Sequence, residues 1–67
     1  MEFSEKIRLV RERLGISQEI LARDLNVSFA TINRWENSKT KPSRMAQDVF
    51  YAYCKKHKIS FDESEEK

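Results

Sequence analysis

The chain has 67 residues, 36% of them charged, with a single Gly and a single Pro. A chain of this length forms one domain at most, and it buries only about 60% of the surface that its unfolded form exposes. Hairpin turns need residues that tolerate positive φ, so the scarcity of such residues disfavours a sheet protein. These features favour a small all-α domain without a deep substrate cavity.

The formal net charge of +2 conceals an uneven distribution of charge. Residues 1–61 hold 12 Lys and Arg against 7 Asp and Glu, whereas the tail at residues 62–67, DESEEK, holds one Lys and four acids. A basic body is compatible with a polyanionic partner, although many domains without such a partner carry a similar charge. The tail has no apolar anchors, so we expect a disordered extension or a linker stub.

The single Cys and the single His give little support for a catalytic nucleophile or a metal site. Cys54 is the only Cys, which leaves it without an intrachain disulfide and rules out a multi-Cys cluster. Its place on an apolar stripe favours a core thiol over a nucleophile. His57 lies three residues further on, but two ligands are too few for a structural zinc site. We therefore expect no metal, no cofactor and no catalytic residue, and argue against an enzyme.

The longest apolar run, residues 49–54, is far too short to span a membrane, and the N-terminus is amphipathic. The sequence therefore predicts a soluble cytoplasmic protein with no membrane partner. No feature of the sequence points to a small-molecule ligand.

The first two predicted helices follow each other closely. Apolar residues recur at positions 3, 7, 10 and 14, which predicts a helix over residues 4–14 that Gly15 closes in the left-handed conformation. The intervening polar positions, including Lys6, are expected to face solvent. Ser17 caps a second helix over residues 18–25, and Asn26 is expected to end it in the same left-handed geometry.

The third predicted helix begins after a tight turn, with Ser28 as its cap. On a helical wheel, Ile32 and Trp35 define its buried side, and Phe29 lies on the border. The residues that point away from the buried side are Ala30, Asn33, Arg34 and Asn37.

Residues 38–42 predict a basic loop closed by Pro42, and a fourth helix is expected from near Ser43. Ile59 and Phe61 are expected to fold back over the bundle. The apolar stripe predicted for the fourth helix comprises Ala46, Val49, Phe50, Tyr53 and Cys54. The expected architecture is a compact bundle of four short helices, with room for a fifth, in a domain of residues 1–61 followed by the tail at 62–67.

Residues 17–38 read SQEILARDLNVSFATINRWENS, and Lys39 and Pro42 follow. The succession S-Q-E-x-L-A, L-x-V-S, Ile, W-E-N and then Lys and Pro resembles the Cro/CI-type, or xenobiotic-response-element, family of helix-turn-helix domains in bacterial and phage transcriptional regulators. The resemblance covers about residues 4–56, with the helix-turn-helix proper at about 17–37, and implies a lambda-repressor-like bundle. Asn26 and Ser38 stand where the family usually has Gly, and Ile20 replaces a Glu that would complete a capping box with Ser17.

The resemblance implies sequence-specific binding of double-stranded DNA by a transcriptional regulator, expected to be a repressor, with the third helix in the major groove. The positions matching base-reading residues are Phe29, Ala30, Asn33 and Arg34. Arg34 suits guanine and Asn33 adenine, whereas Phe29 and Ala30 suit thymine methyl groups. The residues expected at the phosphates are Gln18, Ser28, Asn37, Lys39, Thr40, Lys41 and Arg44.

The family also often pairs an Arg of the first helix with a Glu at the end of the third, and Arg11 and Glu36 match that pair. A homodimer on a near-palindromic site is one option, through the fourth helix, an exposed Tyr51, or Ile59 and Phe61, and a monomer is the other.

Several alternatives stay open at this stage. Asn33 and Arg34 also fit an ordinary solvated helix face, Phe29 fits packing on the bundle edge as well as groove contact, and Trp35 fits the core better than a stacking platform. The whole domain also fits the DNA-targeting N-terminal part of a larger enzyme, such as a DNA methyltransferase. A protein-interaction module that kept the fold is a further alternative.

Overall fold

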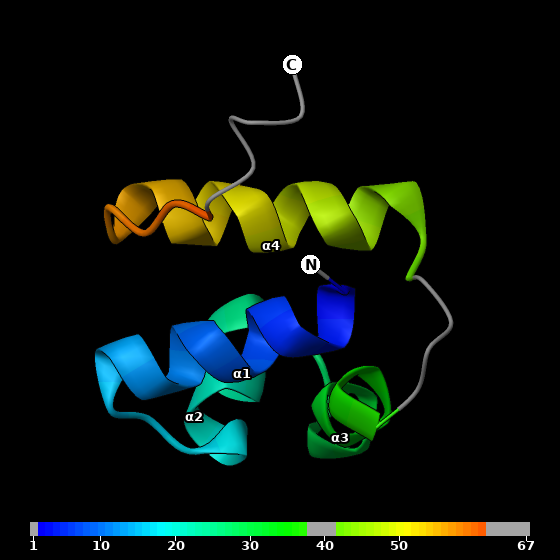
Figure 1. Cartoon of the computed structure of the whole chain (residues 1–67). Coiled ribbons are helices and arrows are strands. Elements are labelled where there is room, and N and C mark those ends of the chain that lie inside the picture. Colours follow the sequence, from blue (N-terminus) through cyan, green and yellow to red (C-terminus); the bar gives the residue numbers. More distant parts are fainter. Residues whose placement is uncertain (1, 38–41, 62–67) are drawn as a thin grey trace.

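The computed structural model describes residues 2–37 and 42–61 (Figure 1). These residues form four helices: α1 (Phe3–Leu14), α2 (Gln18–Leu25), α3 (Phe29–Asn37) and α4 (Arg44–Lys56). They contain no strand, so the predicted all-α fold is confirmed. No fifth helix occurs in the described part of the chain, because residues 57–61 are not helical. The predicted tail at 62–67 and positions 38–41 of the predicted loop lie outside the described residues.

The helix ends have the local geometry that the sequence predicts. Gly15 closes α1 at φ 65° and Asn26 closes α2 at φ 62°, both in the left-handed region. The N-cap hydroxyls accept hydrogen bonds from backbone N–H groups three residues on: Ser17 from Ile20, Ser28 from Thr31 and Ser43 from Ala46, each at 3.1 Å. Each such cap stabilises its helix by about 1 kcal/mol.

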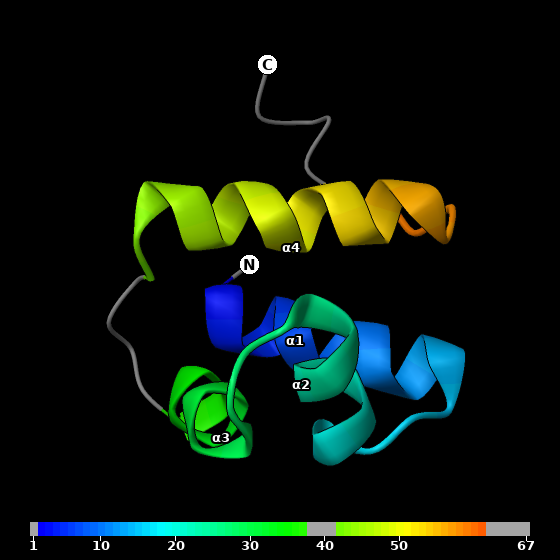
Figure 2. The ribbon, with the colours of Figure 1, turned by 180° about the vertical axis from the view of Figure 1, so that it is seen from behind.

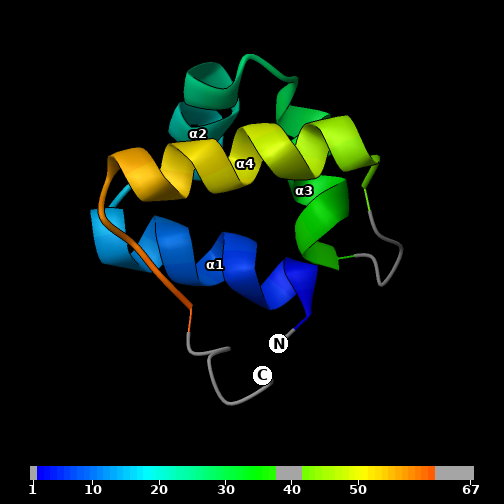
Figure 3. The ribbon, with the colours of Figure 1, turned by 90° about the horizontal axis from the view of Figure 1, so that it is seen from above.

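The four helices surround a single core (Figure 1). From behind, α2 and α3 follow each other through a short turn (Figure 2). Seen from above, α4 lies across the bundle between α1 and α2 (Figure 3). The largest fully buried side chains come from all four helices and are Phe50, Ile7, Leu21, Ile32 and Val10. Ala22 is buried where α2 approaches its neighbours, and α3 contacts both α1 and α2.

Lys6 departs from the expected pattern because it is buried rather than solvent-facing. Its Nζ donates a hydrogen bond to the Tyr51 hydroxyl at 2.8 Å and lies 5.0 Å from the centroid of that ring and 5.4 Å from that of Phe61. The aliphatic stem covers apolar surface while the ammonium group meets aromatic faces, which lets a charged side chain occupy an apolar site.

The buried side of α4 differs from the apolar stripe predicted for it at two residues, Val49 and Tyr51. Val49 was expected to be buried but is 46% exposed, because α4 turns Phe50 and Cys54 toward the core. Tyr51 was expected to be exposed but packs against the core, with its ring 5.4 Å from that of Phe50. Ile59 is buried and Phe61 packs on the same core, so the predicted fold-back of this segment is confirmed.

Candidate nucleic-acid interface

One face of α3 carries the four residues predicted to contact bases. Phe29, Ala30, Asn33 and Arg34 are all exposed, whereas Ile32 on the other side of the helix is fully buried. Phe29 is 49% exposed although its side chain is entirely apolar. Trp35 is half-buried and makes an edge contact with Phe3, with ring centroids 5.6 Å apart. Helix α3 therefore separates a packed side from a polar side that holds one exposed phenyl ring.

Asn33 and Asn37 are linked on the exposed side of α3. The Asn37 Nδ2 donates hydrogen bonds to the backbone carbonyl of Asn33 at 2.9 Å and to its side-chain Oδ1 at 3.0 Å. The Asn37 side-chain nitrogen is therefore turned toward Asn33 within the helix. Their spacing of four residues places them side by side on a helix, although no link between them was predicted.

The residues predicted to contact phosphate occupy helix starts and the region beyond α3. Gln18 and Arg44 are the first residues of α2 and α4, and Arg44 is exposed. The Ser28 hydroxyl lies before α3, where it caps Thr31 and shares a 2.8 Å hydrogen bond with the Thr31 hydroxyl. Lys39, Thr40 and Lys41 lie outside the described residues.

Glu36 fastens α3 to α1 from the side opposite the exposed face. Its carboxylate is 5% exposed and accepts two hydrogen bonds from Arg11, from Nε at 2.5 Å and from Nη2 at 3.0 Å. This fork-to-carboxylate pairing is the strong bidentate form. The hydrogen bond to Glu36 raises the pKa of the Arg11 guanidinium, against the smaller opposing effect of burial.

Arg8 takes part in the same connection, although it was not among the residues predicted from the sequence. Its Nη2 donates to the backbone carbonyl of Glu36 at 2.9 Å, and its Nε lies 3.9 Å from Glu36 Oε1. Arg8 precedes Arg11 by three residues and therefore shares its face of α1, which was the available signal. Two guanidinium groups thus meet the last turn of α3, where the helix dipole favours positive charge.

A further inter-helix hydrogen bond joins α4 to α2. The Tyr53 hydroxyl donates a hydrogen bond to Asp24 Oδ2 at 2.9 Å, and the His57 ring lies 4.4 Å from the Tyr53 ring. Burial, followed by the hydrogen bond to Asp24, raises the pKa of Tyr53 to about 12. The sequence held no signal for this contact, since it joins residues 29 positions apart.

Cys54 lies in the core, and burial raises the pKa of its thiol from 9.0 to about 11. Above pH 9 the unfolded chain therefore loses the thiol proton while the folded protein keeps it. We expect the free energy of unfolding to fall as the pH rises from about 9 to about 11. Urea titrations across this interval measure the fall.

Cys54→Ala is the matched control for this pH dependence. In this variant the free energy of unfolding should no longer show the fall that is due to the thiol. The fall that is due to Tyr53, which extends toward pH 12, should remain. An identical pH dependence in the wild type and the variant would contradict the assignment.

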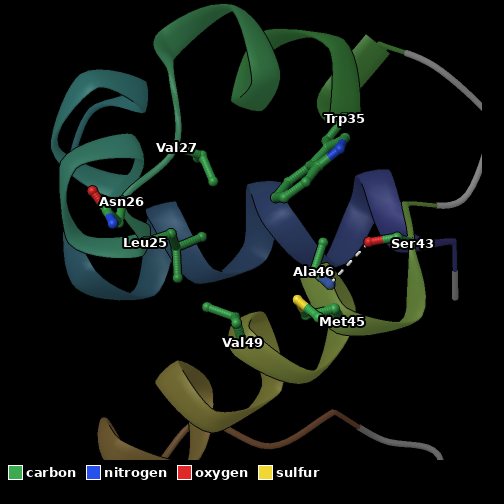
Figure 4. A pocket seen from close by; sticks show the side chains of 8 residues that line it. All are labelled: Leu25, Asn26, Val27, Trp35, Ser43, Met45, Ala46 and Val49. Carbon is green, nitrogen blue, oxygen red and sulfur yellow. Dashed lines mark hydrogen bonds between the residues drawn. The ribbon is translucent and has the colours of Figure 1, made fainter.

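A cavity of about 280 Å³ lies between the turn after α2, the last part of α3 and the start of α4 (Figure 4). Its lining residues are Leu25, Asn26, Val27, Trp35, Ser43, Met45, Ala46 and Val49. At its rim, Met45 is 76% exposed. None of these lining side chains is charged, so they supply no charged group to a ligand in the cavity.

Within residues 2–37 and 42–61, His, Cys, Asp and Glu nowhere gather in a group of three that could hold a metal ion. None of the helices described is both long and apolar enough to cross a membrane.

Comparison with known proteins adds two findings. A family model described as helix-turn-helix matches residues 7–63 of this chain. The chain is also 42% identical over 43 residues to the HTH-type transcriptional activator BcrR of Enterococcus faecalis, a match that covers 64% of this chain and 21% of that protein. The matched segment thus spans about a fifth of the relative's length. No solved structure gives a significant match.

Proposed function

We propose a function on the premise that this chain belongs to the Cro/CI-type helix-turn-helix family, as the match over residues 7–63 establishes. The function is DNA binding in the regulation of transcription. More specifically, α3 enters the major groove of double-stranded DNA and reads its sequence. The observation that carries this proposal is the division of α3 into a packed side and an exposed side that holds all four predicted base-reading residues.

The base-reading side chains differ in chemistry. Arg34 donates a bidentate pair of hydrogen bonds to guanine O6 and N7, the commonest specific contact to a base. Phe29 and Ala30 have no polar side-chain atom and instead contact the methyl groups of thymine. Because DNA would cover an exposed phenyl ring at the start of α3, this contact also gives the exposure of Phe29 a function.

Phosphate contacts position the domain without reading bases. In this proposal, Gln18 and the N-terminal amides of α2 bind one stretch of backbone, because a helix N-terminus attracts anions. Ser28 and Arg44 bind the flanking backbone, together with Lys39, Thr40 and Lys41, which remain predictions. Asn37 is less suited to phosphate, because its side-chain nitrogen already donates to Asn33 within α3.

A homodimer on a near-palindromic site completes the proposal, since two copies set two recognition helices about 34–36 Å apart. Among the surfaces expected to mediate dimerisation, Tyr51, Ile59 and Phe61 pack within the bundle. Met45 and Val49 on α4 are exposed apolar side chains, and we therefore place the contact between the two copies on this helix. Such a regulator acts in the cytoplasm of a bacterium, where the DNA lies.

Two candidate roles remain for a DNA-binding domain of this kind, and they differ in whether the domain acts alone or as part of a longer protein. The first candidate is a repressor that acts by occupying promoter DNA. The similarity to an activator, of which the chain covers 21%, favours a second candidate, a DNA-targeting domain that directs a longer protein to its site.

Selection from random duplexes at physiological salt, followed by titrations of the winning site against salt, tests the proposal. We expect an enriched motif, and log affinity should fall linearly with log salt by about 0.9 for each phosphate neutralised. Two half-sites at a fixed spacing indicate a dimer, and one half-site indicates a monomer. Failure to enrich any motif, with no salt-dependent binding, would favour a protein-interaction module instead.

A further inference from the structure

We propose that Asn37 is a specificity-determining positioning residue, which turns the amide group of Asn33 toward the groove and so favours guanine or thymine over adenine at the base that Asn33 meets. This inference rests on the proposed function and makes it more specific. It starts from the two hydrogen bonds that the Asn37 side chain makes within α3.

The orientation of both side chains follows from one backbone group. The main-chain carbonyl of Asn33 can only accept a hydrogen bond, so the atom of Asn37 that lies 2.9 Å from it must be the donor Nδ2. The nearest side-chain amide atom of Asn33 lies 3.0 Å from the same Nδ2, and a nitrogen there would place a donor against a donor, so this atom is Oδ1. The opposite orientation of either amide would place a donor against a donor or an acceptor against an acceptor.

The consequence concerns the free end of the Asn33 side chain. With Oδ1 aimed at Asn37 along the helix, Nδ2 is the end that faces away, and Asn33 meets the groove as a donor. On a helix the side chain leans toward the N-terminal turn, which here carries Phe29 and Ala30. The small Ala30 leaves room for the amide beside the phenyl ring.

An Asn side chain that presents only its Nδ2 donor prefers different bases from one that presents both Nδ2 and the acceptor Oδ1. Bidentate recognition of adenine by Asn needs both amide atoms aimed at one base edge, with Oδ1 accepting from N6 and Nδ2 donating to N7. A side chain that presents only Nδ2 pairs with acceptors, which are O6 and N7 of guanine, O4 of thymine and N7 of adenine. At adenine the N6 amino group beside N7 is itself a donor and opposes Nδ2, whereas guanine offers two neighbouring acceptors. The adenine contact expected from the sequence is therefore disfavoured as long as Asn37 holds Oδ1.

An exposed pair of amides four residues apart is a weak interaction in water. It becomes stronger when DNA covers this face and excludes water, because the local dielectric constant falls. Asn37 thus influences base choice most in the bound complex, although it touches no base in this proposal.

The test compares base preference among wild type, Asn37→Ala, Asn37→Asp and Asn33→Ala, using the selected duplex with each of the four base pairs at every position. Asn33→Ala identifies the base that Asn33 meets, because preference is lost at that position only. In wild type we expect guanine or thymine to exceed adenine there by at least about fivefold. Asn37→Ala should reduce this ratio to near one or reverse it.

Asn37→Asp provides a second, directional variant. A carboxylate cannot donate, so it should attract the Asn33 Nδ2 and leave Oδ1 facing the groove. The preference should then move toward bases that present a donor, adenine N6 or cytosine N4. The added negative charge weakens binding to every duplex alike, so only ratios between duplexes are compared.

The outcomes separate the two proposals. If the wild type shows no sequence preference or salt dependence, the proposed function fails. Two results would overturn this inference while DNA binding stands, provided that the wild type binds specifically. In the first, Asn33→Ala changes the base preference at no position of the duplex. In the second, the Asn37 variants keep the wild-type ratio of guanine or thymine to adenine. Circular dichroism of each variant confirms folding, which exposed Asn37 should not affect.

Discussion

Replacing Glu36 by Ala should unfold a large fraction of the protein at physiological temperature. The substitution leaves the Arg11 guanidinium without its bidentate partner and removes the closest link between α1 and α3. Removing one partner of a buried ion pair costs about 3–5 kcal/mol. A domain of this length has a total stability of only about 3–10 kcal/mol, so the loss is a large part of the whole. Thermal melts followed by circular dichroism measure it.

The matched control for this experiment is Glu12→Ala, which removes an exposed carboxylate from α1. Its melting temperature should stay close to that of the wild type, since surface charges contribute little. Arg11→Lys should fall between the two, because Lys keeps the charge but lacks the planar fork that meets both carboxylate oxygens. An unchanged melting temperature for Glu36→Ala would refute the structural role of the pair.

Arg34→Ala should have the largest effect on DNA recognition. Loss of a bidentate contact to guanine costs about 1–3 kcal/mol, which corresponds to a weakening of about 5- to 150-fold on the selected site. Binding to unrelated duplexes should change little, and the melting temperature should not change because Arg34 is exposed. Titration of selected and unrelated duplexes at one salt concentration measures the ratio.

Arg13→Ala is the control for Arg34→Ala, since it removes the same charge from an exposed position on α1. It should leave the ratio of selected to unrelated binding unchanged. A different outcome reassigns Arg34: if affinity falls equally for all duplexes and the salt slope drops by about one, Arg34 contacts phosphate rather than a base.

Most of the backbone could be predicted because its signals are local. Gly15 and Asn26 end helices in left-handed geometry within one residue of the last turn. Ser17, Ser28 and Ser43 cap the helices that follow, through hydrogen bonds spanning three residues. Local signals of this kind do not depend on how the helices pack.

The packing of α4 could not be predicted in the same detail. Helical periodicity identifies a stripe of apolar residues, but the rotation of the helix against its neighbours decides which edge of the stripe is buried. That rotation exposes Val49 and partly buries Tyr51, and it brings the Tyr51 ring to the ammonium group of Lys6. These outcomes depend on contacts between residues far apart in the sequence, such as the Lys6–Tyr51 hydrogen bond across 45 positions.

The candidate site shows the same division. The exposure of Phe29, Ala30, Asn33 and Arg34 agrees with the helical wheel, while their contacts with DNA stay predictions. The Asn33–Asn37 link was within reach of the sequence, because a spacing of four on a helix brings side chains together. The sequence could not show which amide atom of Asn33 faces Asn37. That orientation depends on the hydrogen bond from Asn37 Nδ2 to the backbone carbonyl of Asn33.

The interleaving of roles along α3 has a consequence for how this domain can change. Ile32 and Glu36 are buried one turn apart, while Asn33 and Asn37 follow each of them by one residue on the exposed side. Under the proposed function, stability and target choice therefore reside in separate sets of positions on one short helix. A lineage, or an engineer, can exchange the exposed set for other side chains and retarget the domain without rebuilding what holds it folded.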